Sequence, residues 1–119
     1  MNTLALTTFI LLSLARVDVA PLKEDPILSQ RAEIRAEQLC EGNQWSHEGW
    51  EEAYGQTDYR FHGENLAKGF NDLHAAHQAL MQSPSHRENI LNPNYQRFGI
   101  GYSEECDIVV QFYGGGFMF

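Results

Sequence analysis

Two segments near the end of the chain have the composition of β-strands, and they constrain the fold more than any other feature. Residues 98–102 (FGIGY) and 108–113 (IVVQFY) are rich in aromatic and β-branched residues. Residues 103–107 between them are few enough to form a hairpin turn. Because the helical patterns precede this strand pair, the sequence predicts an α+β fold in which helices pack on a small sheet.

A helix is predicted to start at Asp25-Pro26, since an acidic cap followed by proline is typical of helix starts. Gly42 is placed to end this helix, because glycine tolerates the backbone conformation that follows a last turn. The apolar stripe on one face of the predicted helix consists of Leu28, Ala32, Ala36 and Leu39.

The middle of the chain predicts a strand and a further helix. Residues 59–62 (YRFH) have strand character, and Gly63 is expected to break the strand. Asn71 or Asp72 then caps a helix. Its inner face carries Leu73, His77, Leu80 and Met81. His74 and His77 have a spacing that can hold a metal, but we interpret His77 as a residue at the edge of the core.

Residues 83–91 (SPSHRENIL) predict a short helix that presents a histidine. The hydroxyl of Ser83 is expected to cap free backbone N–H groups, and Pro84 fixes φ at the first helical position. His86 falls in the opening turn, where the positive end of the helix dipole should keep the imidazole neutral. Since a neutral imidazole can bind a metal or accept a proton, His86 is a candidate site residue.

Length and charge restrict the function classes. The 119 residues amount to one domain, 1–119, and hydrophobic residues make up 43% of them, which is enough for a core. The net charge is −8, and lysine and arginine do not cluster. We therefore expect no binding to nucleic acid and none to an anionic membrane surface.

The apolar segment at residues 3–15 (TLALTTFILLSLA) has two interpretations, a buried first helix and a secretory signal peptide. No lysine or arginine precedes the segment, and Asp18 occupies a position where a signal-peptide cleavage site has a small residue. The segment is also too short to span a membrane. We favour the buried helix, and expect neither a signal peptide nor a transmembrane segment.

Several motifs, in order along the chain, resemble those of the CAP superfamily, which comprises cysteine-rich secretory proteins, antigen five and plant pathogenesis-related proteins. Residues 63–67 (GENLA) and 83–91 are similar to two of its signature motifs. Residues 45–47 (WSH) resemble the segment with the first family histidine, and residues 98–101 and 109–114 resemble the closing strands. The chain is most similar to the short prokaryotic SCP-like branch.

This resemblance implies an α-β-α sandwich, with a small antiparallel sheet, helices on both faces and an open cleft. In the family, two histidines and two glutamates line the cleft. His47 and His86 match the histidines, and Glu64 matches the first glutamate. Ser83 stands where the second glutamate is expected, so one acid of an acid–base pair is missing.

Two functions are open for His47, Glu64 and His86. The histidines could bind Zn²⁺ or another divalent metal, with Glu64 as a third ligand or as the base of a peptidase-like hydrolase. Alternatively, Glu64 orients one imidazole through its ring N–H. Because the second glutamate is missing, we favour a non-catalytic binding or interaction module at a surface. Its ligand would be a lipid, a peptide, a glycan or a protein partner.

Four more residues could line the cleft: Trp45, His62, Asn65 and Ser83. His62 could instead face solvent or aromatic rings, which we consider the more frequent case. Ser83 could form a Ser–His pair with His86, but its role as a helix cap explains it without one.

Cys40 and Cys106 are the only cysteines. In a family of secreted proteins the even count suggests a disulfide, and two buried free thiols are an equally weighted alternative. The family also implies an extracellular location. Since no convincing signal peptide is present, leaderless export and an accessory role in a virion or a secretion apparatus are alternatives.

Overall fold

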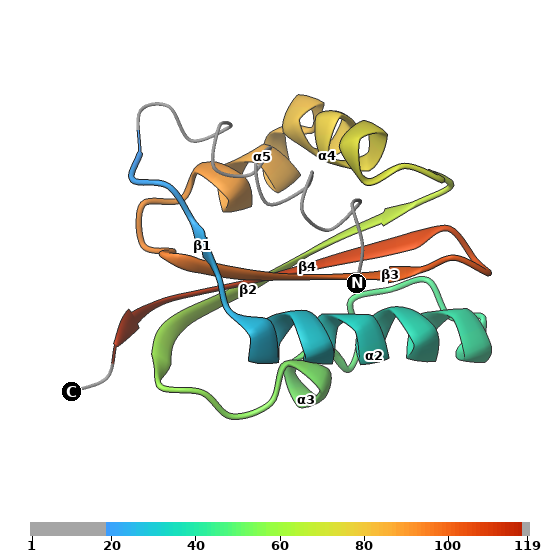
Figure 1. Ribbon diagram of the computed structural model, residues 1–119, viewed down its shortest axis with the longest axis horizontal. Helices are drawn as coiled ribbons and strands as arrows, with labels where there is room; N and C mark the ends of the chain where they lie inside the picture. Colours follow the sequence, from blue (N-terminus) through green and yellow to red (C-terminus); the bar gives the residue numbers. More distant parts are fainter. Residues whose placement is uncertain (1–18, 118–119) are drawn as a thin grey trace.

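The computed structural model describes residues 19–117, which form a four-stranded sheet with helices on both faces (Figure 1). In chain order the elements are β1 (Lys23–Glu24), α2 (Pro26–Gly42), α3 (Trp50–Tyr54), β2 (Tyr59–Lys68), α4 (Leu73–Gln82), α5 (Pro84–Leu91), β3 (Arg97–Ser103) and β4 (Ile108–Phe117). Helices α2 and α3 cover one face of the sheet, and α4 and α5 cover the other (Figure 1). The expected α+β sandwich is confirmed. The predicted helix at residues 3–15, like the signal-peptide alternative, lies outside the described residues.

The strand order is β1-β3-β4-β2, and β4 pairs antiparallel with both of its neighbours. The family resemblance implies an antiparallel sheet, but the two-residue β1 runs parallel to β3 and makes the sheet mixed. The reason is the connection to α2. As the chain enters this helix, Lys23 and Asp25 donate backbone hydrogen bonds to the carbonyls of Gln96 and Phe98, which pairs the free edge of β3.

Strand β2 corrects the prediction that Gly63 ends a short strand. The strand continues through Gly63, which pairs with Tyr113 of β4, and it ends at Lys68. Glycine is needed here because Tyr95 lies against the backbone, with its Cζ 3.0 Å from the position a Cβ at residue 63 would take. The Tyr95 hydroxyl donates to the carbonyl of His62 at 3.0 Å. The long-range contact with Tyr95 therefore explains this glycine, and the end of a strand does not.

The helix ends agree with the local predictions, with one shift. Asp25 accepts a hydrogen bond from the N–H of Ile27 at 2.9 Å, and Asp72 accepts one from His74 at 2.7 Å. Gly42 is the last residue of α2, and Asn43 takes the left-handed conformation that was expected of the glycine, with φ of 47°. Asparagine tolerates this conformation better than most residues.

The disulfide is confirmed. Cys40, near the end of α2, is bonded to Cys106 in the turn before β4, and their Cα atoms are 5.6 Å apart. The two residues are 66 positions apart in the sequence. The bond therefore ties the far end of the long helix to the β3–β4 hairpin.

Two glycines of β3 allow α2 to lie directly on the sheet. A Cβ on Gly99 would overlap the backbone of Leu28 and Ser29, and a Cβ on Gly101 would overlap that of Ala32 and Glu33. The small residues on α2 and β3 thus bring the two backbones close together. The FGIGY motif is explained by packing as well as by strand propensity.

Substituting Gly101 by alanine is expected to lower the free energy of unfolding by about 2–3 kcal/mol, because α2 would have to move away from β3. Urea denaturation measures the loss. Gly42→Ala is the matched control: a Cβ there meets nothing within 4 Å, so alanine should be neutral or stabilise α2. Equal midpoints for the two variants would contradict the close packing.

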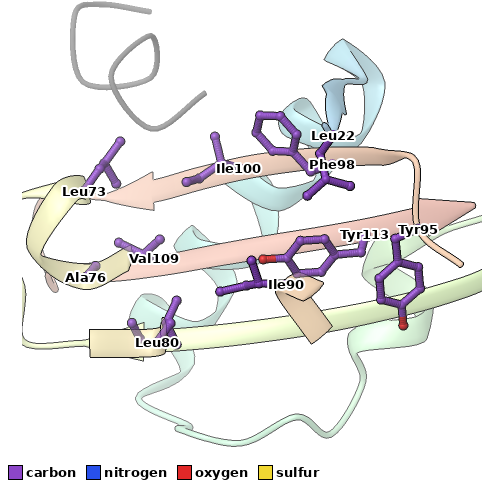
Figure 2. Close-up of a cluster of buried hydrophobic side chains, with 11 residues drawn as sticks. Leu22, Leu73, Ala76, Leu80, Ile90, Tyr95, Phe98, Ile100, Val109 and Tyr113 are labelled. Carbon is purple, nitrogen blue, oxygen red and sulfur yellow. The ribbon is translucent and has the colours of Figure 1, made fainter. Parts of the chain in front are cut away.

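The second face of the sheet has its own core, which Figure 2 shows. Buried side chains of α4 and α5 meet those of β3 and β4, and they include Leu73, Ala76, Leu80, Ile90, Phe98, Ile100, Val109 and Tyr113. Tyr95 stacks on Tyr113 with ring centroids 5.5 Å apart. Because this core holds α4 and α5 in place, it also positions the residues carried at their junction.

Candidate binding cleft

A cavity of 410 Å³ opens between the loop after α2, the second half of β2, and helices α4 and α5. Three chain segments that are distant in sequence therefore build its walls. The lining residues are Trp45, Ser46, His47, Leu66, Ala67, Lys68, Phe70, Ala79, Leu80, Ser83 and His86. Two histidines predicted from the sequence, His47 and His86, share this cavity.

His47 is held by the buried carboxylate of Glu64. The imidazole Nδ1 is 2.8 Å from Oε1 of Glu64, and the His47 side chain is 56% exposed while that of Glu64 is 1% exposed. Since a carboxylate only accepts hydrogen bonds, Nδ1 carries the proton. In the neutral ring the lone pair is then on Nε2, which makes no hydrogen bond within the described residues.

Arg35 on α2 completes this arrangement, and the sequence analysis did not single it out. Its Nε donates to Oε2 of Glu64 at 2.9 Å, and the guanidinium also donates to the carbonyls of Ser46 (3.0 Å) and Glu48 (3.2 Å). Arg35 is only 5% exposed. It thus neutralises the buried carboxylate and fixes the loop that carries His47. A charged residue inside the apolar stripe of α2, three positions after Ala32, was the available signal.

His86 lies in the first turn of α5, as predicted, but Ser83 does not act as expected. The Ser83 hydroxyl makes no capping hydrogen bond with the helix backbone, and its Oγ is 2.8 Å from Nδ1 of His86 instead. The His86 ring is within hydrogen-bonding reach of the Ser83 hydroxyl. The hydroxyl therefore pairs with this ring and not with a backbone N–H of the helix. The Ser–His pair is therefore formed, and the explanation of Ser83 by capping alone is wrong.

Burial, and secondarily the charge of nearby His47, lowers the pKa of His86 below the usual value for histidine. The ring is therefore neutral at physiological pH. The neutral imidazole agrees with the expectation, but its causes are burial and His47 and not the helix dipole that the expectation invoked.

Asn65 lies beneath the cleft and does not line the cavity. It is fully buried, and its amide donates to the backbone carbonyl of His86 at 3.1 Å. The amide of Asn89 donates back to Asn65 Oδ1 at 2.9 Å and to the carbonyl of Glu64 at 3.3 Å. These side chains fasten α5 to β2. The asparagines of the GENLA and SPSHRENIL motifs therefore set the distance between α5, which carries His86, and β2, whose Glu64 holds His47.

The other candidate residues are placed differently. His62 is exposed on β2 outside the cavity, with its ring packed edge-on against Tyr54 at 5.2 Å between centroids. This is the solvent-facing and aromatic environment that we considered more frequent. Trp45 lines the cavity at its rim and is 45% exposed. The Lys68 ammonium lies 5.7 Å from the centroid of the Trp45 ring.

The donor set fits a divalent metal only in part. Both oxygens of Glu64 are already used, one by Arg35 and one by His47, so the carboxylate is not free as a third ligand. Among residues 19–117, no group of three or more His, Cys, Asp or Glu side chains is arranged to hold a metal ion. The two imidazoles could hold an ion with water or a bound ligand completing its coordination, and such an ion would supply a Lewis acid.

The sequence profile of the cysteine-rich secretory protein family, CAP, matches residues 15–114. The chain belongs to the CAP family. A relative named as the uncharacterized protein YkwD of Bacillus subtilis is 34% identical over 100 residues, which is 76% of this chain and 38% of that protein. The chain thus spans less than half the length of this relative.

Solved structures share the CAP fold. An extracellular protein with an SCP domain from Bacillus anthracis superposes with a TM-score of 0.85 at 22% identity, over 94% of this chain and 40% of that one. An outer surface protein of Borrelia burgdorferi gives a TM-score of 0.81 at 22% identity, over 92% and 90% of the two chains. At this level of identity the likeness shows the fold alone. No helix among the described residues has the length and apolar character to cross a membrane.

His77 is buried more deeply than an edge-of-core residue. It is 3% exposed, its Nδ1 is 3.5 Å from the amide nitrogen of Gln111, and its Nε2 has no hydrogen-bond partner among the described residues. Burial, with a smaller contribution from His74, lowers the pKa of His77 from 6.5 to about 4. His77 is therefore a neutral part of the core of this CAP domain.

This burial predicts a loss of stability in acid. The unfolded chain binds a proton on His77 with a pKa of 6.5 and the folded chain only with a pKa of about 4. Stability is therefore fully present above pH 6.5 and falls by about 3 kcal/mol as the pH drops to 4. Urea denaturation across this range should show a weaker pH dependence in His77→Leu than in the wild type. His62→Leu, which replaces an exposed histidine, is the control.

Proposed function

We propose that this CAP domain is a binding module, and that its ligand occupies the cavity beside His47 and His86. The observation that supports this is the composition of the cavity walls, in which two imidazoles lie next to apolar side chains. Its volume of 410 Å³ is in the range of small-molecule sites. Such a cavity can bury an apolar group of a lipid or peptide and make polar contacts at its rim.

We further propose that His47 and His86 together bind a divalent metal weakly. Support comes from the carboxylate of Glu64 at Nδ1 of His47, an arrangement typical of metal-binding histidines. The second imidazole, His86, has a lowered pKa, so it can bind a metal without first losing a proton. Two protein ligands are fewer than zinc enzymes use, so we expect the ion to exchange readily.

The same geometry disfavours the hydrolase alternative. A general base must accept a proton from water, but both oxygens of Glu64 are engaged by Arg35 and His47 beneath the cavity. The carboxylate is thus suited to orient an imidazole. These contacts support our proposal of a binding module over a peptidase.

Titration with n-octanol, followed by backbone amide resonances, tests the cavity. We expect saturable shifts at Leu66 and Leu80, and their loss in Ala79→Phe, which fills the cavity. Ala75→Phe, on the same helix but not in the cavity wall, is the matched control. Shifts that persist in Ala79→Phe, or that occur elsewhere, would overturn the proposal.

Titration with Zn²⁺ tests the imidazole pair. The ring resonances of His47 and His86 should shift together, and His47→Ala should abolish the response at His86. His62→Ala, at an exposed histidine outside the cavity, should leave it intact. Independent responses of the two rings would contradict a shared ion.

A location outside the cell fits this function. The two structural neighbours described above are named as an extracellular protein and an outer surface protein. The disulfide between Cys40 and Cys106 is also of the kind that persists in oxidising compartments. We propose an extracellular or cell-surface location; leaderless export and association with a virion stay predictions.

A further inference from the structure

We infer that the cavity selects an anionic ligand: a molecule with a carboxylate, or a similar monoanionic group, joined to an apolar body. This inference rests on the proposed binding function and adds the chemical class of the ligand. It follows from the charges around the cavity, from the position of Lys68 and from the distribution of apolar residues in the walls.

The charge of the cavity wall is opposite in sign to that of the protein. Lys68 is the only lysine, arginine, aspartate or glutamate among the described residues that line the cavity. The carboxylate of Glu64, which contacts His47, lies below the surface and is paired with Arg35. Among the described lining residues, a ligand in the cavity therefore meets an ammonium group, imidazoles and hydroxyls, and no carboxylate.

Lys68 is held at the rim of the cavity. Its Nζ lies 5.7 Å from the ring centroid of Trp45, which also lines the cavity. A cation above an indole ring is attracted to it and loses some of its freedom. The ammonium is thus kept close to the opening, where it can meet the anionic end of a ligand whose apolar end is inside.

The net charge of −8 does not oppose this selection. At physiological ionic strength, charges more than about 8 Å apart are largely screened, whereas a direct ammonium–carboxylate contact is not. A second cavity, of 500 Å³, has the opposite character because its lining includes Glu37, Glu41, Glu104 and Glu105. Part of the protein's negative charge therefore lies around this second cavity. We expect the two cavities to prefer ligands of opposite charge.

The apolar part of the ligand would contact a separate, apolar part of the cavity wall. Leu66, Ala67 and Leu80 form the inner wall, since they are buried members of the cores on both faces of the sheet. Phe70 and Ala79 extend this wall outward. An ion without an apolar body would leave the wall in contact with water, so we expect inorganic anions to bind poorly.

A series of probes with one tail and three head groups tests the inference: octanoate, octanol and octylammonium. Binding is measured by amide resonances near neutral pH with EDTA, so that no metal contributes. Because an exposed ion pair is worth up to about 1 kcal/mol, octanoate should bind about fivefold more tightly than octanol. Octylammonium should bind the cavity more weakly than octanol, and any shifts it causes near Glu37 or Glu104 report the second cavity.

Substitution of Lys68 assigns the preference to one group. In Lys68→Gln the ratio of octanol to octanoate dissociation constants should fall to about one, and in Lys68→Glu octylammonium should become the preferred probe. Lys23→Gln, which removes the other lysine of the chain, is the control because Lys23 does not line the cavity. It should leave the ratio unchanged.

The outcomes separate the two proposals. If all three probes bind equally, the cavity binds ligands as proposed but the charge selection is refuted. A fivefold preference that survives in Lys68→Gln would also refute it, since another group would then be responsible. If no probe binds, the proposed function fails and the inference fails with it.

Discussion

Arg35→Met is expected to lower the free energy of unfolding by about 4 kcal/mol, because removing one partner of a buried ion pair leaves the other charge uncompensated. Arg35 and Glu64 are 6% and 1% exposed as side chains, and they are joined by a 2.9 Å contact. The substitution also removes the donors to the carbonyls of Ser46 and Glu48, so the loop with His47 should become mobile. Urea denaturation gives the energy, and the His47 ring resonances report the loop.

Arg31→Met is the control for this prediction. Arg31 precedes Arg35 by one helical turn and donates to two backbone carbonyls, those of Tyr54 and Gln56, but has no carboxylate partner among the described residues. We expect a loss of about 1 kcal/mol. The double variant Arg35→Met/Glu64→Gln should recover part of the stability, since it no longer buries a lone carboxylate. If Arg35→Met cost no more than Arg31→Met, the ion pair would not be the anchor of the cleft.

Breaking the disulfide should have a similar effect. Cys40 and Cys106 close a loop with a sequence separation of 66, and the chain-entropy model gives about 4 kcal/mol for a loop of this length. The double variant Cys40→Ala/Cys106→Ala should therefore unfold at much lower urea concentration than the wild type. Since α2 and the β3–β4 hairpin lose their tie, amide exchange should rise first at the end of α2.

A reductant provides the matched test. It should lower the urea midpoint of the wild type to that of the double alanine variant, and it should leave the variant unchanged. Mass spectrometry after alkylation should show no free thiol in the native protein. Alkylation of both cysteines before reduction would refute the disulfide and the stabilisation together.

Local chemistry accounts for the elements that could be predicted. Asp25 and Asp72 accept hydrogen bonds at the helix starts, as expected from side chains that satisfy free N–H groups within their own turn. The segments FGIGY and IVVQFY form paired strands because each carries the residues that suit a pleated, buried surface. The motifs that resemble the CAP family also predict His47, Glu64 and His86 as site residues, since each lies within or beside one of them.

The mistaken predictions concern residues whose partners are distant or compete with the backbone. Gly63 was expected to break a strand. Its lack of a Cβ instead leaves room for the ring of Tyr95, which is distant in the sequence. Ser83 was expected to bond to its own helix backbone, but the His86 ring takes its hydroxyl. In each case the local pattern was compatible with two outcomes.

The amino-acid sequence by itself determined the family and the order of α2, β2, α4, α5, β3 and β4, because caps, apolar spacing and ordered motifs act or are recognisable over short stretches of chain. It did not predict β1 or α3. Only the tertiary structure decided what the cleft is made of. Arg35 and Glu64 are 29 positions apart, and neither residue type indicates burial on its own. Their charges are tolerated in the interior because the packing of α2 on the sheet brings them together, and that pairing then fixes His47 at the cavity.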